Sequence, residues 1–207
     1  MKKRWIAALV LLICFLLAAL SYNYWDIPLA YYCRALSQPV LNIAQIVTIA
    51  GESQWYYYLL VPAYIVFRFI RKNKLWSHRV LFLFVSISAS GLLSSLIKWL
   101  AGRNRPMNLF NNGQFGFDYF RMIHESTSFP SGHTVTAFSL AAAVGILFPG
   151  LRIPVFAFAV AIGISRIMIT AHYLSDVLAG AGIGILCTLV VKYFFDRYNV
   201  ELAPKGY

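Results

Sequence analysis

The sequence has 207 residues, of which 60% are hydrophobic and 12% are charged, and its formal net charge is +11 at pH 7. A water-soluble domain of this length cannot bury so much apolar surface, so we expect the chain to lie in a lipid bilayer. A nucleic-acid-binding protein spreads its basic residues over one solvated face, whereas this chain confines most of its Lys and Arg residues to short gaps between apolar runs, which excludes a nucleic-acid partner.

Six apolar stretches are predicted to cross the membrane, each close to the ~20 residues that a helix needs to span a bilayer. In chain order they cover residues 5–22, 54–71, 79–101, 133–149, 153–171 and 173–195. A weaker apolar segment, residues 36–50, is expected in the membrane interface or against the outside of the bundle. The predicted fold is an all-α integral membrane protein: a six-transmembrane-helix bundle with an additional interfacial helix, in one domain over residues 1–207.

The placement of basic residues predicts that both termini face the cytoplasm. Twelve of the 18 basic residues then lie inside: Lys2, Lys3, Arg4, Arg68, Arg71, Lys72, Lys74, Arg79, Arg152, Lys192, Arg197 and Lys205. The other six lie outside: Arg34, Lys98, Arg103, Arg105, Arg121 and Arg166. A cleaved signal peptide is the alternative interpretation of residues 5–22; the run is long for one and no small-x-small cleavage site precedes Tyr22. The short connecting loops are typical of a bacterial inner-membrane protein.

Neither a metal nor another cofactor is predicted. Cys14, Cys33 and Cys187 are scattered, and we interpret them as small apolar residues. The chain has only seven acidic residues, and no two of them stand at a Mg²⁺-ligand spacing on a predicted span.

Charged side chains beside a membrane span are costly, and the first place that contains them is KWLAGRNRP, at the end of the third span. Lys98 and Arg105 are seven residues apart, close to two helical turns, so they share a face if the helix continues that far. Pro106 is expected to end the helix at Arg105. Arg103 is interpreted as an exposed loop cation, like Arg121.

The second place is the sequence PSGH at residues 130–133, where a long outer loop enters the fourth span. Gly132 allows a ligand to approach the backbone closely, and the free N–H groups of a helix start favour an anion, with the Ser131 hydroxyl beside them. We therefore predict that a phosphate binds here.

The third place is the outer turn between the fifth and sixth spans, which contains Ser165, Arg166, His172 and Asp176. His172 and Asp176 are predicted at positions i and i+4 of one helix start, so that the carboxylate holds one imidazole nitrogen and leaves the other free to attack. Arg166 cannot share that face on a continuous helix, which predicts a chain break between Arg166 and His172.

All three places fall on the same outer side of the predicted bundle, although the charge rule that set the orientation uses neither histidines nor motif spacing. Together they supply two histidines, two arginines and a lysine around one anion, with one carboxylate to orient a base. From the residues alone either histidine can be the nucleophile, and the spacing of Asp176 favours His172.

The three segments also resemble, in order, the signature motifs of the type 2 phosphatidic acid phosphatase superfamily: Lys-x6-Arg-Pro, Pro-Ser-Gly-His and Ser-Arg-x5-His-x3-Asp. Eleven residues match at fixed spacings, and the resemblance covers about residues 54–195. It implies that His172 is the nucleophile, that Asp176 orients it and that His133 protonates the leaving oxygen. It also implies that no metal takes part and that the phosphoryl group is held by Lys98, Arg105, Ser131, Gly132 and Arg166.

The function implied by this resemblance is hydrolysis of the phosphate or diphosphate monoester of a lipid, through a phosphohistidine, at the outer leaflet. Members of the family act on phosphatidylglycerol phosphate, phosphatidic acid, prenyl diphosphates or the 1-phosphate of lipid A. One alternative is a phosphatase of a water-soluble phosphate, as in the glucose-6-phosphatase branch. A second is an anion transporter, which the clustering of the charges at one face disfavours.

Two further segments carry structural predictions. The loop 107–129 contains six aromatic residues that we interpret either as an interfacial anchor or as a rim for substrate access: Phe110, Phe115, Phe117, Tyr119, Phe120 and Phe129. Gly180, Gly182 and Gly184 lie within a span and are expected to permit close helix packing. His78 and His124 match no motif and are expected to be structural or solvated.

Overall fold

The computed structural model describes residues 2–121 and 123–203, so Lys205 lies outside the described residues, as do the side chains of Lys2, Lys3 and Arg4. The helices, in chain order, are α1 (Lys2–Tyr24), α2 (Asp26–Arg34), α3 (Gln38–Ile49), α4 (Ser53–Ile65), the π-helix η1 (Val66–Ile70), α5 (Lys74–Ala101), α6 (Pro106–Asn112), η2 (His124–Ser126), α7 (Gly132–Leu147), η3 (Pro149–Leu151), α8 (Arg152–Met168) and α9 (Leu174–Arg197). The all-α class is confirmed.

The membrane character of the chain is confirmed by its apolar helices. Among the described residues, three helices are long and apolar enough to span a bilayer: α5, α9 and the helical stretch Pro149–Met168. Residues Ala8–Tyr24 and Asp26–Arg34 meet the same criteria as a pair bent by 71°. Helix α7 is apolar but has only 16 residues, and α4 has 13 before η1 continues it. Helices therefore occupy all six predicted positions, while the number of spans stays a prediction.

Helices α7 and α9 form the centre of the bundle. Helix α9 packs against α7, α1 and α5, while α7 also packs against α5 and α8. A Cβ atom added at Gly184 would lie 2.5 Å from the carbonyl oxygen of Val135, and one at Gly180 would lie 3.0 Å from that of Ser131. Gly182 faces α1 instead, where an added Cβ would lie 3.2 Å from the Phe15 ring. The prediction that these glycines permit close helix packing is confirmed.

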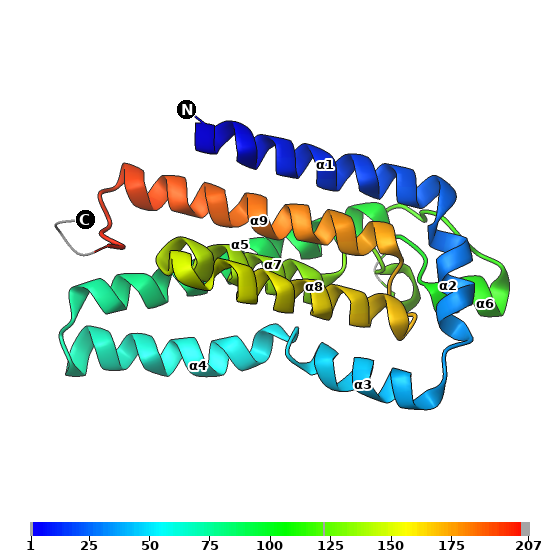
Figure 1. Cartoon of the computed structure of the whole chain (residues 1–207), viewed down its shortest axis with the longest axis horizontal. Coiled ribbons are helices and arrows are strands. Elements are labelled where there is room, and N and C mark those ends of the chain that lie inside the picture. The colour runs from blue at the N-terminus through cyan, green and yellow to red at the C-terminus, as the bar shows by residue number, and fades with distance from the viewer. Residues whose placement is uncertain (1, 122, 204–207) are drawn as a thin grey trace.

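The two ends of the bundle differ in charge. Figure 1 shows the start of α1, the end of α9 and the turn between α4 and α5 at one end, with α2 and α6 at the other. Arg68, Lys72 and Lys74 line one cavity around the α4–α5 turn. The motif residues gather at the opposite end, where Arg103 pairs with Asp26 of α2. The structure thus separates Arg68, Lys72 and Lys74, three of the predicted cytoplasmic cations, from the predicted site.

The segment predicted to lie in the membrane interface or against the outside of the bundle forms α3, which packs against α8. Its isoleucines Ile43, Ile46 and Ile49 are exposed, whereas Thr48 is buried. Helix α3 therefore has an apolar outer face and also places one polar residue near the end of α8. The sequence pattern predicts neither α2 nor α6.

Candidate active site

The first motif is divided between a helix end and a loop. Helix α5 ends at Ala101, and Gly102 caps it in the left-handed conformation (φ 56°) with its N–H donating to the carbonyl of Lys98. Lys98 and Arg105 would share a helical face only if the helix continued to Arg105, and it does not: the chain turns at Gly102 and Pro106 begins α6. The two cations still converge: Lys98 Nζ donates to the Thr127 carbonyl at 2.8 Å, and Arg105 Nη2 donates to the same oxygen at 3.4 Å.

The second motif forms the N-terminus of α7, where Ser131 is the N-cap and Gly132 the first helical residue. The carbonyl of Pro130 accepts from Lys98 Nζ at 2.6 Å, which joins the first motif to the second. Ser131 is buried, and its backbone N–H donates to the Asp176 carbonyl at 3.1 Å, which joins the second motif to the third. A Cβ atom at Gly132 would lie 3.9 Å from Lys98 Cε, so the fold leaves space between this helix start and the lysine.

His172 lies in the turn between α8 and α9, two residues before α9 begins. Helix α8 ends at Met168 and Thr170 has a positive φ of 53°, so the predicted chain break between Arg166 and His172 is confirmed. The Nδ1 atom of His172 lies 2.8 Å from the carbonyl oxygen of Ser128. Because a carbonyl only accepts hydrogen bonds, Nδ1 carries the proton and Nε2 keeps its lone pair.

Asp176 does not hold the imidazole directly. Its Oδ2 atom is 3.7 Å from His172 Nδ1, which is beyond hydrogen-bond distance. The Nδ1–H group donates to the Ser128 carbonyl instead. The same Oδ2 accepts from Ser128 Oγ at 2.6 Å, so Asp176 acts on His172 by its charge and through Ser128. The predicted direct contact is thus replaced by a contact through one serine.

The surroundings of His172 keep its imidazole neutral. Burial lowers the pKa of His172 to about 3; the Asp176 carboxylate opposes this shift, and the positive charges of Lys98 and Arg105 add to it. A neutral imidazole with an unprotonated Nε2 is the form that can act as a nucleophile.

Arg166 and His133 come from α8 and α7. Arg166 is buried near the end of α8, and its Nη1 donates to Thr48 Oγ1 of α3 at 2.8 Å. His133 lies against Gly51, where an added Cβ would be 2.9 Å from the imidazole Cδ2. The buried Nε atoms of Arg105 and Arg166 have no hydrogen-bond partner in the part of the chain that the structure describes. The two guanidinium groups therefore keep donors that the described residues leave available to an anionic substrate.

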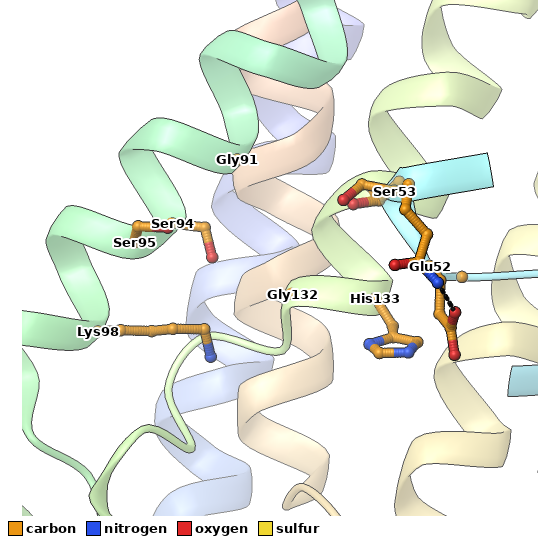
Figure 2. Close-up of a pocket in the computed structure, with 11 residues that line it drawn as sticks. Glu52, Ser53, Gly91, Ser94, Ser95, Lys98, Gly132 and His133 are labelled. Atoms are coloured by element: carbon orange, nitrogen blue, oxygen red, sulfur yellow. Dashed lines mark hydrogen bonds between the residues drawn. The ribbon is translucent and has the colours of Figure 1, made fainter. Parts of the chain in front are cut away.

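A cavity of about 390 Å³ opens beside these residues, between the α3–α4 connection, α5 and α7. Figure 2 shows Lys98 and His133 extending into it from α5 and α7, with Gly132 between them. The other predicted site residues do not line it: Ser131, Arg166, His172 and Asp176 are buried and Arg105 is half-buried. Further polar residues in its wall are absent from the sequence prediction: Glu52, Ser53, Gln54, Ser94, Ser95 and Thr136.

The prediction that Arg103 is an exposed loop cation is wrong. Its side chain is 1% exposed and forms ion pairs with Asp176 (2.5 Å) and Asp26 (2.6 Å). Phe115, Phe117 and Phe129 of the loop 107–129 surround it, whereas Tyr119 and Phe120 are exposed as an interfacial anchor would be. Asp26 is also missed, although an acidic residue four positions after the first apolar run, in a chain with seven acidic residues, is a signal.

The remaining charged residues fit their predicted minor roles. Arg121 is exposed and pairs with Asp118 at 3.2 Å, and His124 is exposed in η2. His78 lies at the opposite end of the bundle, near the carbonyl of Glu201. Within residues 2–121 and 123–203 no group of three or more His, Cys, Asp or Glu side chains is arranged to hold a metal ion.

Comparison with known sequences gives a family and several relatives. The family model of the PAP2 superfamily matches residues 79–199, which contain all three motifs. The lipid A 1-phosphatase of Rhizobium johnstonii is 32% identical over 181 residues, which cover 82% of this chain and 74% of the relative. That of Rhizobium etli is 38% identical over 128 residues, 61% of this chain and 55% of the relative. Phosphatidylglycerophosphatase B of Bacillus subtilis is 28% identical over 176 residues, 78% of this chain and 79% of the relative.

Solved structures share the fold. The crystal structure of a transmembrane PAP2-type phosphatidylglycerolphosphate phosphatase from Bacillus subtilis superposes with a TM-score of 0.68 at 25% identity, over 92% of this chain and 96% of the other. The crystal structure of Aquifex aeolicus LpxE superposes with a TM-score of 0.63 at 23% identity, over 81% of this chain and 94% of the other.

Proposed function

The chain belongs to the PAP2 superfamily, and from this premise we propose that it is a membrane lipid phosphatase that works through a phosphohistidine on His172. The observation that carries the proposal is the hydrogen bond from His172 Nδ1 to the Ser128 carbonyl, which leaves Nε2 unprotonated. This nucleophile lies close enough to Lys98 and Arg105 for their charges to act on it, and Lys98 lines the adjacent cavity.

In the first proposed step, Nε2 of His172 attacks the phosphorus of the substrate in line. The Nε2–P bond forms, the bond from phosphorus to the lipid oxygen breaks, and His133 gives that oxygen a proton. Lys98, Arg105 and Arg166, with Ser131 and the backbone N–H groups at Gly132, balance the charge on the phosphoryl oxygens.

In the second step, His133 accepts a proton from a water molecule that attacks the phosphorus. The P–Nε2 bond breaks and inorganic phosphate leaves, so both histidines return to their starting states. Throughout the cycle the cationic side chains supply the positive charge that a metal ion supplies in other phosphatases, and we propose that no metal is required.

Among lipid phosphates, we propose the 1-phosphate of a lipid A-type glycolipid as the leading substrate. The support is sequence similarity, because relatives at 32% and 38% identity are lipid A 1-phosphatases. The polar wall formed by Glu52, Gln54 and Ser94 suits a headgroup that carries hydroxyl groups. Phosphatidylglycerol phosphate follows, since a relative at 28% identity is a phosphatidylglycerophosphatase; phosphatidic acid and prenyl diphosphates complete the set.

We further propose that the enzyme lies in a bacterial inner membrane with both termini in the cytoplasm and the site at the outer leaflet. The support is the positive-inside rule together with the separation of Arg68, Lys72 and Lys74 from the motif residues. A site at helix ends reaches a phosphate headgroup while the lipid tail stays in the bilayer.

Phosphate release by the purified protein tests this proposal, with lipid A, phosphatidylglycerol phosphate, phosphatidic acid, undecaprenyl diphosphate and glucose 6-phosphate as substrates. We expect release from at least one lipid, undiminished by a chelator, and a loss of at least ~10³-fold in His172→Ala. His124→Ala, an exposed histidine near the same end, is the matched control and should be unchanged. Near-normal turnover by His172→Ala, or activity that needs Mg²⁺, would contradict the proposed chemistry; a preference for glucose 6-phosphate would contradict the lipid substrate.

A further inference from the structure

Asp26 lies at the bend between α1 and α2, where the helices meet at 71°. Its buried carboxylate accepts four hydrogen bonds: from Ser21 Oγ (2.7 Å), from the Ser175 N–H (3.0 Å), from Ser175 Oγ and from Arg103 Nη2 (2.6 Å). The donors belong to α1, to the first turn of α9 and to the loop after α5. Asp26 therefore joins three segments that are distant along the chain, although it lies outside the residues that the family model matches.

Arg103 lies between Asp26 and Asp176. Its Nη1 donates to Asp176 Oδ1 at 2.5 Å and to Ser175 Oγ at 2.6 Å. Five aromatic rings have centroids 4.8 to 6.0 Å from the guanidinium carbon: Tyr22, Phe115, Phe117, Phe129 and Tyr173. The Arg103 side chain is 1% exposed, and its removal from solvent strengthens these charge interactions. Burial opposes the charge of Arg103, but Asp176 and Asp26 together raise its pKa, so the guanidinium stays protonated.

The other oxygen of Asp176 is held by residues next to His172. Oδ2 accepts from Ser128 Oγ at 2.6 Å and from the Tyr173 N–H at 2.8 Å. The Ser128 carbonyl accepts from His172 Nδ1, and the Ser128 N–H donates to the Arg103 carbonyl at 2.9 Å. A continuous set of buried hydrogen bonds therefore connects Asp26 to the imidazole.

We propose that Asp26 and Arg103 are positioning residues that set the place and the charge of Asp176 beside His172. This inference rests on the proposed role of His172 as the nucleophile. Two carboxylates share one guanidinium, so the trio keeps one negative charge, and Asp176 lies 3.7 Å from Nδ1. Phosphorylation of Nε2 makes the imidazole ring positive, and this negative charge stabilises it. Without the charge of Asp26, Arg103 neutralises Asp176 alone and the stabilisation weakens.

The test is the steady-state kinetics of Asp26→Asn in the full-length purified protein, with the lipid phosphate that the wild type hydrolyses fastest. We expect kcat to fall by about 10-fold or more, as when partners that orient a catalytic group are removed, with KM within about 3-fold of the wild type. Asp26→Glu restores the charge and should recover part of kcat. Asp196→Asn, which loses an exposed pair with Lys192 at the opposite end, is the matched control and should be unchanged.

Ser175→Ala removes only a hydroxyl group from the same network, so it provides a second test if Asp26→Asn folds poorly. We expect it to lower kcat as well. A folded variant of either kind with wild-type kcat, or one in which only KM changes, would overturn the positioning role. The positioning role would also be overturned if kcat, corrected for the fraction of folded protein that thermal melting gives, equalled the wild-type kcat. His172→Ala separates the two proposals: if it is inactive while Asp26→Asn is normal, only this inference fails, and if it is active the nucleophile assignment fails.

Discussion

The reactive state of His172 depends on Ser128, which holds two groups at once. Its backbone carbonyl accepts from Nδ1, and its hydroxyl donates to Asp176 Oδ2. A backbone acceptor cannot take up the proton, so the tautomer with a free Nε2 persists whatever the protonation of nearby carboxylates. The carboxylate then contributes charge rather than a direct hydrogen bond.

Burial of a neutral histidine has a consequence for stability. The pKa of His172 is about 3 in the folded protein against an ordinary 6.5, so between these values the unfolded chain binds a proton that the folded chain does not. The free energy of unfolding therefore falls as pH falls through this window, by at most about 1.4 kcal/mol per pH unit from this residue. We expect His172→Asn to flatten the decline of the melting temperature between pH 6.5 and pH 4.5, measured in detergent.

Asparagine is suited to this experiment because its side-chain N–H can still donate to the Ser128 carbonyl while the group no longer titrates. His124→Asn is the control, since His124 is exposed and its replacement should leave the slope as it is in the wild type. A His172→Asn slope as steep as the wild-type slope would show that the imidazole is not buried in its neutral form.

At the scale of helices, the contact between α7 and α9 sets the geometry of the site, because α7 carries His133 and α9 carries Asp176. An alanine at Gly184 would place its Cβ 2.5 Å from the Val135 carbonyl and 2.8 Å from the Ser139 N–H. Backbone atoms cannot move aside as a flexible side chain can, so α9 must shift away from α7. We expect Gly184→Ala to lower stability by about 1–3 kcal/mol, the usual cost of overpacking, and to lower the melting temperature accordingly.

Gly150→Ala is the matched substitution, because a Cβ at Gly150 meets no atom within 4 Å. It should melt within a degree or two of the wild type. If the two variants melted alike, the close approach of α7 and α9 would not be a determinant of stability.

The sequence predicts the helices and motifs well because both depend on local patterns. Apolar runs of span length and fixed motif spacings place Lys98, His133, Arg166 and His172 in one region without knowledge of the fold. The connections are predicted less well: α5 ends at Ala101 instead of Arg105, since the left-handed cap at Gly102 stops the helix before Pro106. Gly102, four residues before Pro106, is the local signal for this earlier helix end.

Local sequence patterns do not show which buried side chains from distant segments pair with one another. Arg103 and Arg105 are two residues apart. Arg103 is enclosed by aromatic rings and lies between two carboxylates, whereas Arg105 donates to Thr127. Which of the two is enclosed depends on the fold of the loop after α5 and on the bend that brings Asp26 to it. The sequence assigns Arg105 to the phosphate site by its motif but treats Arg103 as a loop cation, because the burial of Arg103 arises only when distant segments meet.

At the scale of the whole molecule, the distribution of charge predicts a direction across the membrane. Arg68, Lys72 and Lys74 gather around one end of the bundle, and the site lies at the other. Basic residues in short loops are retained on the cytoplasmic side. The exposed Tyr119, in the loop next to the site, should then face the outside, and the exposed Lys72 should face the cytoplasm.

Thiol labelling tests this orientation directly. We expect a membrane-impermeant maleimide to label Tyr119→Cys but not Lys72→Cys in intact spheroplasts, and to label both after permeabilisation. The background is a variant with Cys14, Cys33 and Cys187 replaced by alanine, and phosphatase activity verifies that each variant is folded. Labelling of Lys72→Cys alone in intact spheroplasts would place the site in the cytoplasm. The positive-inside rule would then fail for this chain, and its lipid phosphate substrate would have to be presented at the inner leaflet instead.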